Sequence, residues 1–528
     1  MWELYLEGWA LFTPETIFMM MIGTIIGVLI GALPGLSVMM AVAIFIPITY
    51  SLSPAAGILM LIGVYSGGNY GGAITATLIN IPGTPSAVMT TLDAYPMAKQ
   101  GHAGLAIGIA TLASVVGGLF SAIILAVLAP MVAGIALRFT SLEMMSIAIF
   151  GLSIMAYITP GSSTKGLLAG VIGLLITTIG LDPMTAAQRF TFGRIELLSG
   201  LQFVPAMIGL FGLSEVFLAM EGRNKVAEKP KFFPVKNPFL AFTRPYLKRL
   251  GGALMRSSIV GTIIGVIPGA GGTIASIVAY AQEKKVNKNR ENFGKGAPEG
   301  VAAAEAATNA CIGGALLVLL AIGIPGDAVT AIILGAFVVH GLTPGPMLFA
   351  TNMDLVSAIF IGLVVIKLLI IVLGAFCAKY FARALLIPKP ILNTTILVLC
   401  VLGSYAVQNS MFDVWAMVIF AVLGYLMNKI SFPKPPIVLA MVLGVLFENN
   451  FRRWVHLSDG DIVGSLMNSW SANPISLVIL SITAITLVLP FFQKSKLTDA
   501  SATQFKATAT AAEEAKPEEE TTTEEEEK

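Results

Sequence analysis

Apolar stretches long enough to cross a bilayer recur along most of this sequence, and they constrain its fold more than any other feature. A helix needs about 20 mainly apolar residues to span the hydrocarbon core. Only 12% of the residues are charged, which is about half the share found in soluble proteins. The sequence therefore predicts an all-α polytopic membrane protein with about 12 transmembrane segments. The apolar stretches lie at residues 17–48, 55–82, 104–136, 143–159, 165–181, 203–220, 252–282, 302–340, 353–381, 391–409, 411–428, 435–447 and 474–492.

Two polar segments organise the chain. Residues 221–251 hold a cluster of lysines and arginines between two apolar halves. From residue 493 onward, Ser, Thr and Ala give way to a run of glutamates that cannot bury enough apolar surface to fold. We predict a first transmembrane repeat at 1–220, a basic cytoplasmic linker at 221–251, a second transmembrane repeat at 252–492 and a disordered acidic tail at 493–528.

The two halves carry the same helix-breaking motifs in the same order. Residues 27–35 end in Pro-Gly and match residues 261–269, 234 positions later. The Ile-Pro-Gly at 81–83 recurs at 324–326, 243 positions later, and a motif beginning at Asn69 resembles one beginning at Asn309. A competing register pairs residue 23 instead of residue 27 with residue 261. We prefer the Pro-Gly register because it aligns the helix breakers, and two ordered motifs in each half argue against chance similarity.

Basic residues indicate how each half sits in the membrane. The stretch 252–282 has basic loops at both ends, so the positive-inside rule places both ends in the cytoplasm. The Pro-Gly near its middle supplies the bend of a re-entrant hairpin. The equivalent stretch 17–48 has no basic residue at either end, and the first in the chain is Lys99. That hairpin would open to the outside, and opposite orientation of equivalent segments predicts two inverted-topology repeats, which are common in secondary transporters.

The helix interruptions are the candidate binding elements. A Pro-Gly inside a membrane segment frees backbone groups, which are tolerated at that depth only where protein or water surrounds them. Amides freed at the start of a half-helix carry the positive end of its dipole and can hold an anion. Alternatively, proline and glycine could merely kink ordinary membrane helices. The occurrence of four such breaks in a repeated pattern argues against this alternative. The predicted carboxylate-binding residues lie at or near the four breaks: Gly35, Ser37, Asn69, Thr75, Gly83, Thr84, Ser86, Gly269, Gly271, Gly272, Thr273, Asn309 and Gly326.

Ionisable and polar groups inside the membrane are candidates for coupling transport to an ion gradient, because a charge at mid-bilayer costs about 2.5–3.5 kcal/mol even on a lenient scale. Asp327 follows the last break directly, and Glu305 and Asn80 lie in the segments that precede the two Ile-Pro-Gly motifs. We interpret these three as candidates for holding sodium or a proton. For Lys367, in the middle of 353–381, burial against a carbonyl or snorkelling is favoured over contact with substrate.

Several functional classes are disfavoured by the sequence. No P-loop is present, so ATP hydrolysis is not built in. Three scattered histidines and three cysteines in apolar stretches do not form a metal-binding motif. A net charge of +2 gives no indication of a nucleic-acid partner, and no paired nucleophile and base indicates an enzyme. We expect no cofactor beyond a coupling ion.

The second half contains a long motif with a recognisable pattern. Residues 292–310, followed by Gly-Ile-Pro-Gly at 323–326 and His-Gly-Leu-Thr-Pro-Gly-Pro at 340–346, resemble the large membrane subunit of tripartite tricarboxylate transporters, the TctA family. Residues 31–36, 70–75 and 81–86 of the first half match as well, and the resemblance covers about residues 10–490.

This resemblance implies a secondary transporter, a symporter for citrate-like tricarboxylates and other small carboxylates, in the bacterial inner membrane. It implies two partners: a small four-helix membrane subunit and an extracytoplasmic solute-binding protein. Two departures bear on substrate identity or coupling: Ala304 stands where the family pattern has proline, and Thr308 where it has asparagine.

Two other functions remain open from the residues alone. Broken helices and re-entrant loops also build the selectivity filters of channels, so a passive anion channel is one alternative. A non-transporting membrane scaffold is the other. The acidic residue at one helix break favours the transporter.

Overall fold

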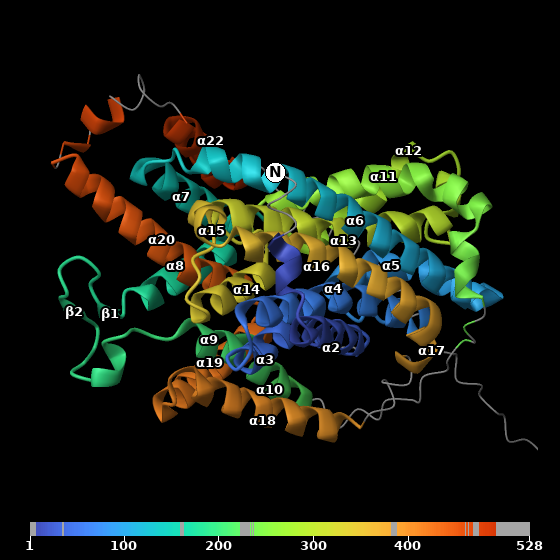
Figure 1. The fold of residues 1–528 in the computed structure, drawn as a ribbon, viewed down its shortest axis with the longest axis horizontal. Helices are drawn as coiled ribbons and strands as arrows, with labels where there is room; N and C mark the ends of the chain where they lie inside the picture. The colour runs from blue at the N-terminus through green and yellow to red at the C-terminus, as the bar shows by residue number, and fades with distance from the viewer. Residues whose placement is uncertain are drawn as a thin grey trace, which may run out of the picture.

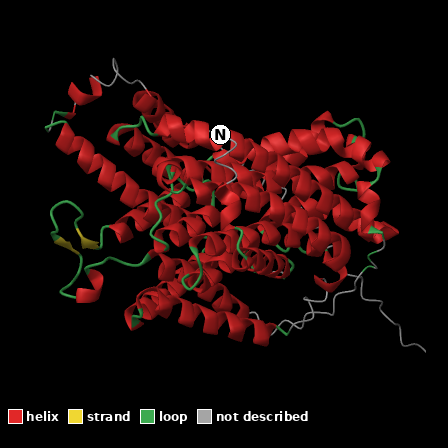
Figure 2. Cartoon of the chain, viewed as in Figure 1, coloured by secondary structure: helices red, strands yellow, loops and turns green. Residues whose placement is uncertain are grey.

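The computed structural model describes residues 7–33, 36–158, 163–221, 233, 235, 237–381, 388–459, 461–462, 464–467 and 475–492. The predicted acidic tail, Gly35, and residues 222–232, 234 and 236 of the predicted basic linker lie outside these residues. Almost all of the described chain is helical, with one short two-stranded hairpin (Figure 2).

The helices follow the apolar stretches closely, which confirms an all-α polytopic membrane protein. Seven described helical segments are long and apolar enough to cross a membrane, and shorter apolar helices accompany them. The helix predicted to begin near 252 in fact begins at Arg244, inside the predicted linker. In the first half the elements are α2 (Pro14–Gly31), α3 (Val38–Thr49), α4 (Pro54–Ile79), η2 (Pro85–Ala87), α5 (Val88–Met97), α6 (Ala103–Ala136), α7 (Ser141–Ile158), α8 (Ser163–Thr177), β1 (Gly180–Leu181), β2 (Gln188–Arg189), α9 (Phe203–Met207), η5 (Ile208–Leu213) and α10 (Ser214–Glu221).

The second half has a similar order of elements around its own helix breaks. Its helix α20 runs ten residues beyond the apolar stretch predicted at 435–447. The elements are α11 (Arg244–Val266), α12 (Gly271–Val286), α13 (Pro298–Ile322), α14 (Ala328–Val339), α15 (Pro346–Thr351), α16 (Met353–Val372), η9 (Leu373–Cys377), α17 (Ala378–Phe381), α18 (Lys389–Gln408), α19 (Met411–Lys429), α20 (Pro435–Leu457) and α22 (Ile475–Phe492).

Glycines let α2 and α4 approach each other at backbone distance. A side chain at Gly27 would clash with the backbone of Val64, and one at Gly31 would clash with the carbonyl of Gly68. On the opposing helix, Gly71 faces the carbonyl of Val28 in the same way. The spacing of four residues keeps these glycines on one face of α2. The run of glycines in the sequence is therefore explained by helix packing.

The same approaches recur between α11 and α13 in the second half. Gly261 faces Ala307, Gly265 faces Cys311, and Gly314 faces Thr262. Each residue of α11 lies 234 positions after its counterpart in α2, and each residue of α13 lies 243 positions after its counterpart in α4. The contacts thus follow the register that aligns the Pro-Gly breaks.

This register changes one correspondence suggested by the motifs. With a separation of 243, the counterpart of Asn309 is Ser66 rather than Asn69. The two asparagines begin similar-looking motifs, but the packing of the helices pairs different residues. Local motif similarity misplaced the pair because the spacing between asparagine and the following glycines differs in the two halves.

The two halves interlock across their breaks. Helix α12 of the second half packs against η2 of the first, and α3 of the first half packs against α14 of the second. Helices α6 and α13 pack extensively at the centre, as the ribbon shows (Figure 1). In each half, the second arm of the predicted hairpin (α3 or α12) therefore packs against the segment that follows the Ile-Pro-Gly break of the other half (α14 or η2).

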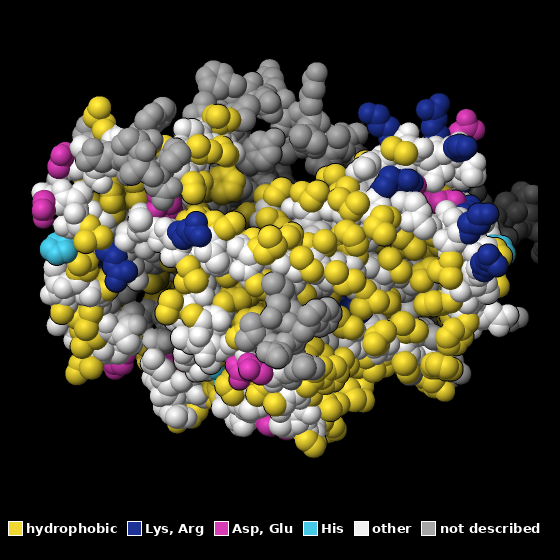
Figure 3. Space-filling model, turned by 45° about the horizontal axis from the view of Figure 1, so that its top comes forward, with side chains coloured by type: hydrophobic (Ala, Val, Ile, Leu, Met, Phe, Trp, Pro, Cys, Tyr) yellow, Lys and Arg dark blue, Asp and Glu magenta, His cyan; other side chains and the backbone are white. Residues whose placement is uncertain are grey.

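The two ends of the bundle differ in character. A broad hydrophobic surface covers the middle of the molecule, and lysines and arginines gather mainly at the right-hand end of the view (Figure 3). The end of α12, where Lys284 and Lys285 lie, is on that side, and the β1–β2 hairpin projects from the opposite end (Figure 1). This arrangement fits a bundle whose longest axis, horizontal in Figure 1, lies along the membrane normal.

Gly83 provides a test of the close packing at the first break. A methyl group there would clash with the carbonyl of Gly31 and come within 2.6 Å of Thr75 Oγ1. We expect Gly83→Ala to lower the free energy of unfolding by about 1–3 kcal/mol, as overpacking does. Thermal unfolding of the purified protein in detergent measures this change. Gly134→Ala is the control, because its added methyl meets nothing within 4 Å, and equal melting temperatures for both variants would contradict the prediction.

Candidate functional site

The candidate site lies where the start of α12 meets the segment after the first-half Ile-Pro-Gly. A Cβ added at Gly272 would lie 3.4 Å from Ser86 Cβ and 3.4 Å from Thr308 Cγ2. These three residues come from different elements, α12, η2 and α13, and both Ser86 and Thr308 are buried. The interlocking of the two halves therefore brings a helix start and a hydroxyl-rich turn together. We call Gly272, Ser86 and Thr308 the junction.

Hydrogen bonds between side chains order the first-half part of the junction. Ser86 Oγ donates to Asn69 Oδ1 at 3.1 Å and lies 3.1 Å from Thr84 Oγ1. All three residues are buried. The structure thus brings together Asn69, Thr84 and Ser86, three predicted site residues whose hydroxyl and amide groups can turn to meet a carboxylate.

A backbone hydrogen bond joins the two breaks of the second half. The amide of Gly269 donates to the carbonyl of Gly326 at 2.8 Å. Gly271 follows with φ of 64°, and its added Cβ would lie 3.5 Å from Asp327 Cβ. The left-handed conformations of Gly269 and Gly271 explain why glycine occupies both positions. The Gly269 amide, predicted to face substrate, is already used to join the two breaks.

Asp327 has a structural role that the sequence did not predict. Its Oδ1 accepts from the Thr330 amide at 2.8 Å, and Thr330 Oγ1 accepts from the Asp327 amide at 2.9 Å, which makes a capping box at the start of α14. Its Oδ2 accepts a hydrogen bond from the hydroxyl of Tyr65 on α4. Asp327 thus caps a helix and links the second-half break to the first half.

Other predicted site residues serve local structure. Ser37 caps α3 by accepting from the Met40 amide at 3.1 Å. Thr75 donates to the carbonyl of Gly72 at 3.3 Å, and Asn80 ends α4 in a left-handed conformation. The amide of Gly83 donates to that same carbonyl at 3.4 Å, and Thr273 accepts from Ser276 through its carbonyl at 2.8 Å. None of these bonds joins the two halves.

Glu305 and Asn309 lie in a second buried cluster on α13. Glu305 accepts from Thr90 and Ser114, while Asn309 donates to Ser114 and accepts from Lys367. Asn309 was predicted to bind substrate together with the helix breaks. Its bonds instead connect it to Glu305 and Lys367.

Sequence reasoning missed residues that the fold brings to these clusters from other helices. They share one property: each is a polar side chain in an apolar or glycine-rich segment with no nearby break to mark it. The missed residues are Tyr65, Ser66, Thr90 and Ser114. Lys367 was recognised from its position in the middle of a membrane segment, and its side chain is fully buried, but its partners Ser66 and Asn309 could not be predicted.

The junction has the chemistry of an anion site. The first amides of a helix have no partner within it, and the helix dipole adds positive potential there. Helix α12 starts with two glycines, which lets a small ligand approach its backbone closely. The hydroxyl of Thr84 can add a donor for a carboxylate group, and that of Ser86 can do so by turning away from Asn69 Oδ1. Among the residues that the structure describes, no group of three His, Cys, Asp or Glu is arranged to hold a metal ion.

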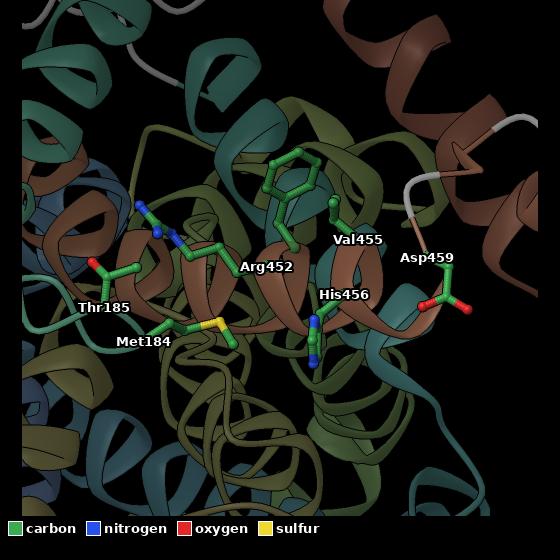
Figure 4. Close-up of a pocket in the computed structure, with 7 residues that line it drawn as sticks. Met184, Thr185, Arg452, Val455, His456 and Asp459 are labelled. Carbon is green, nitrogen blue, oxygen red and sulfur yellow. The ribbon is translucent and has the colours of Figure 1, made fainter.

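Two cavities lie away from the junction, at the end of the bundle where the β1–β2 hairpin projects. One of about 560 Å³ is lined by Met184 and Thr185 from the hairpin loop and by residues of α20 (Figure 4). The other, of about 290 Å³, lies between the hairpin and α20. Hydrogen bonds from the Thr185 and Met184 amides lower the pKa of Asp182 to about 2, which keeps this carboxylate charged beside Arg452 at 2.7 Å.

Comparison with known proteins places these features in context. The sequence model of one family, described as "Tripartite tricarboxylate transporter TctA family", matches residues 17–439. An uncharacterized 52.8 kDa protein of Agrobacterium vitis from the TAR-I ttuC' 3' region is 36% identical over 478 residues, covering 90% of this chain and 94% of that protein. A second uncharacterized A. vitis protein, from the TAR-II ttuC' 3' region, is 34% identical over 229 residues, covering 43% of this chain and 93% of that protein. No solved structure matches.

Proposed function

The chain belongs to the tripartite tricarboxylate transporter TctA family, and from that premise we propose that it is the translocating membrane subunit of an ion-gradient-driven transporter for small carboxylates. The observation that carries the proposal is the junction of Gly272, Ser86 and Thr308. Here the start of α12 from one half faces hydroxyls from the other. One carboxylate group of a citrate-like acid would bind to the amides of α12 and to Thr84 and Ser86.

The repeated packing supports a transport cycle in which the two halves exchange access. The α2–α4 and α11–α13 pairs share the same set of glycine contacts, and α12 and α3 each reach across to the other half. We propose that the two repeats have inverted topology in the membrane. In such an arrangement, movement of the hairpin arms would open the junction to one side and then to the other.

The bundle presents different surfaces to the two sides of the membrane. We place the lysine- and arginine-rich end in the cytoplasm, following the positive-inside rule, and the protein in the bacterial inner membrane. The β1–β2 hairpin then projects outside, where Phe192 and Ile195 are 85% and 79% exposed. We assign this outer end to the solute-binding protein. The small four-helix subunit would contact the apolar flank of the bundle.

Uptake by reconstituted protein tests the function. The chain, its small membrane subunit and its solute-binding protein are placed in proteoliposomes with radiolabelled citrate and a panel of other carboxylates. Sodium and pH gradients are imposed separately. We expect one carboxylate to accumulate above its external concentration, and to stop doing so when the gradients collapse. Uptake that runs only downhill would support a channel instead, and no uptake of any acid would support a scaffold.

A further inference from the structure

A fully buried lysine lies in the middle of α16. The side chain of Lys367 has no solvent exposure. Its Nζ donates to Asn309 Oδ1 at 2.9 Å and to Ser66 Oγ. Gly118 on α6 makes room for it, because an added Cβ there would clash with the lysine stem. The ammonium group therefore does not snorkel to an interface, and the fold builds a specific place for it.

A continuous chain of hydrogen bonds leads from this lysine to a buried carboxylate. Asn309 Nδ2 donates to Ser114 Oγ at 3.0 Å, and Ser114 Oγ lies 3.3 Å from Glu305 Oε2, to which it donates. Thr90 donates to Glu305 Oε1 at 2.6 Å. Every member of this chain is at most 1% exposed. The members come from α4, α5, α6, α13 and α16, so both halves contribute.

The two bonding partners of Lys367 hold equivalent positions in the two halves. Ser66 on α4 and Asn309 on α13 are 243 residues apart, which is the separation of the glycine contacts that pair these helices. The lysine thus bonds to both halves through residues at equivalent positions of α4 and α13. Any movement of one half against the other changes its contacts, so the network can respond to the transport cycle.

Other titratable groups on these helices and on their packing partners are engaged elsewhere. Tyr65 bonds to Asp327, and Tyr70 lies 2.9 Å from Thr111. Asp354 lies 13 residues before Lys367 on α16, about 20 Å along the helix. Further acidic groups and a cysteine on these elements are Asp93, bonded to the loop before α13, Glu299, paired with Arg249, Glu283, paired with Arg256, Glu15, bonded to Ser53, and Cys311, buried on α13.

We propose that Lys367 and Glu305 hold and release the coupling proton, so that this pair and not a bound sodium ion links carboxylate uptake to the ion gradient. An ammonium group already occupies the oxygen ligands Asn309 Oδ1 and Ser66 Oγ, and its charge repels a second cation. In the arrangement seen here, Glu305 accepts from Thr90 and Ser114, as an ionised carboxylate does. A proton arriving from one side adds to the Glu305 carboxylate as substrate binds, and leaves to the other side as substrate is released.

The proton also balances charge. With Lys367 protonated and Glu305 ionised, the network is neutral overall, and such a pair is tolerated in a low-dielectric interior. Protonation of Glu305 leaves one net positive charge near the junction, because Asn309 is adjacent in sequence to Thr308. That charge favours an anionic substrate, and the substrate favours the proton. This inference rests on the proposed transport function.

The test compares two isosteric changes, Lys367→Met and Glu305→Gln, in proteoliposomes with citrate or the carboxylate that the uptake panel identifies. We expect a pH gradient alone to drive accumulation by the unaltered protein, and each change to reduce that accumulation at least tenfold. Exchange of labelled for unlabelled substrate without a gradient should persist. Lys434→Met is the matched control, because Lys434 is also buried but bonds to Ser214 and Glu215 away from the network.

A second measurement does not depend on transport. Infrared spectra of the substrate-free protein in lipid are recorded as the pH is varied. We expect a titrating carboxylic acid band that disappears in Glu305→Gln and shifts its titration in Lys367→Met, but not in Lys434→Met. The proton assignment is overturned if the unaltered protein shows no such band, or if neither Glu305→Gln nor Lys367→Met changes it. It is also overturned if a sodium gradient drives accumulation and Lys367→Met leaves that accumulation intact. If the unaltered protein moves no carboxylate, the transport function fails, while the infrared titration still decides whether this pair exchanges a proton.

Discussion

Replacing Gly272 by alanine should reduce carboxylate uptake at least tenfold while leaving the protein folded. The added methyl group would sit 3.4 Å from both Ser86 Cβ and Thr308 Cγ2, which is ordinary van der Waals contact. The fold can therefore accept it, and alanine inside a helix is favoured over glycine by about 0.5–1 kcal/mol. The methyl group nevertheless fills the space between the start of α12 and Ser86, where we place the substrate. A loss of about 1.4 kcal/mol in binding already lowers affinity tenfold.

The measurement pairs uptake with stability. Initial uptake rates in proteoliposomes are compared with melting temperatures of the same preparations, and Gly134→Ala serves as the control for a glycine-to-alanine change in a membrane helix. Gly83→Ala supplies the contrast, since its methyl group clashes with backbone and should lower stability. Normal uptake by a stable Gly272→Ala protein would remove the junction as the binding site.

The sequence was most informative where residues act locally. Apolar length gave the helices, and the Pro-Gly and Ile-Pro-Gly motifs marked the interruptions at which α12 and α14 begin. Four-residue spacing of glycines in α2 and α11 gave helix faces that pack closely. These features depend on neighbouring residues and on the bilayer, and both can be read from a single chain.

The parts that sequence could not give depend on which distant segments meet. The link from Tyr65 to Asp327 joins α4 to the second-half break, and Lys367 reaches both Ser66 and Asn309. No local pattern encodes such pairs. The Gly269 amide was expected to face substrate but donates to Gly326, because the two breaks of one half close against each other. A sequence motif can therefore show that a backbone amide leaves its helix, but it does not show whether another segment accepts a hydrogen bond from that amide.

Asp93 should be among the residues whose loss costs the most stability. Its buried carboxylate on α5 accepts from three backbone amides, of Gly294, Gly296 and Ala297, at 2.8–2.9 Å, and from the hydroxyl of Tyr280 at 2.8 Å. These bonds hold the first half against the loop that leads into α13. Of these donors, the Ala297 amide and the Tyr280 hydroxyl belong to buried residues, while Gly294 is exposed and Gly296 is half-buried. Each buried donor left without a partner costs about 1–3 kcal/mol. We therefore expect Asp93→Ala to lower the free energy of unfolding by about 2–6 kcal/mol.

Asparagine at position 93 separates the hydrogen bonds from the charge. Its Oδ1 can still accept from the three amides, and its Nδ2 can donate to the Tyr280 hydroxyl, so Asp93→Asn should keep most of the stability that Asp93→Ala loses. Asp354→Ala, at the half-buried start of α16, should cost less than about 1 kcal/mol. Melting temperatures and the yield of monodisperse protein give the order of the three variants. An Asp93→Ala protein that melts with the Asp354→Ala control would mean that the loop before α13 is held by other contacts, and that the two halves do not depend on this carboxylate to stay together.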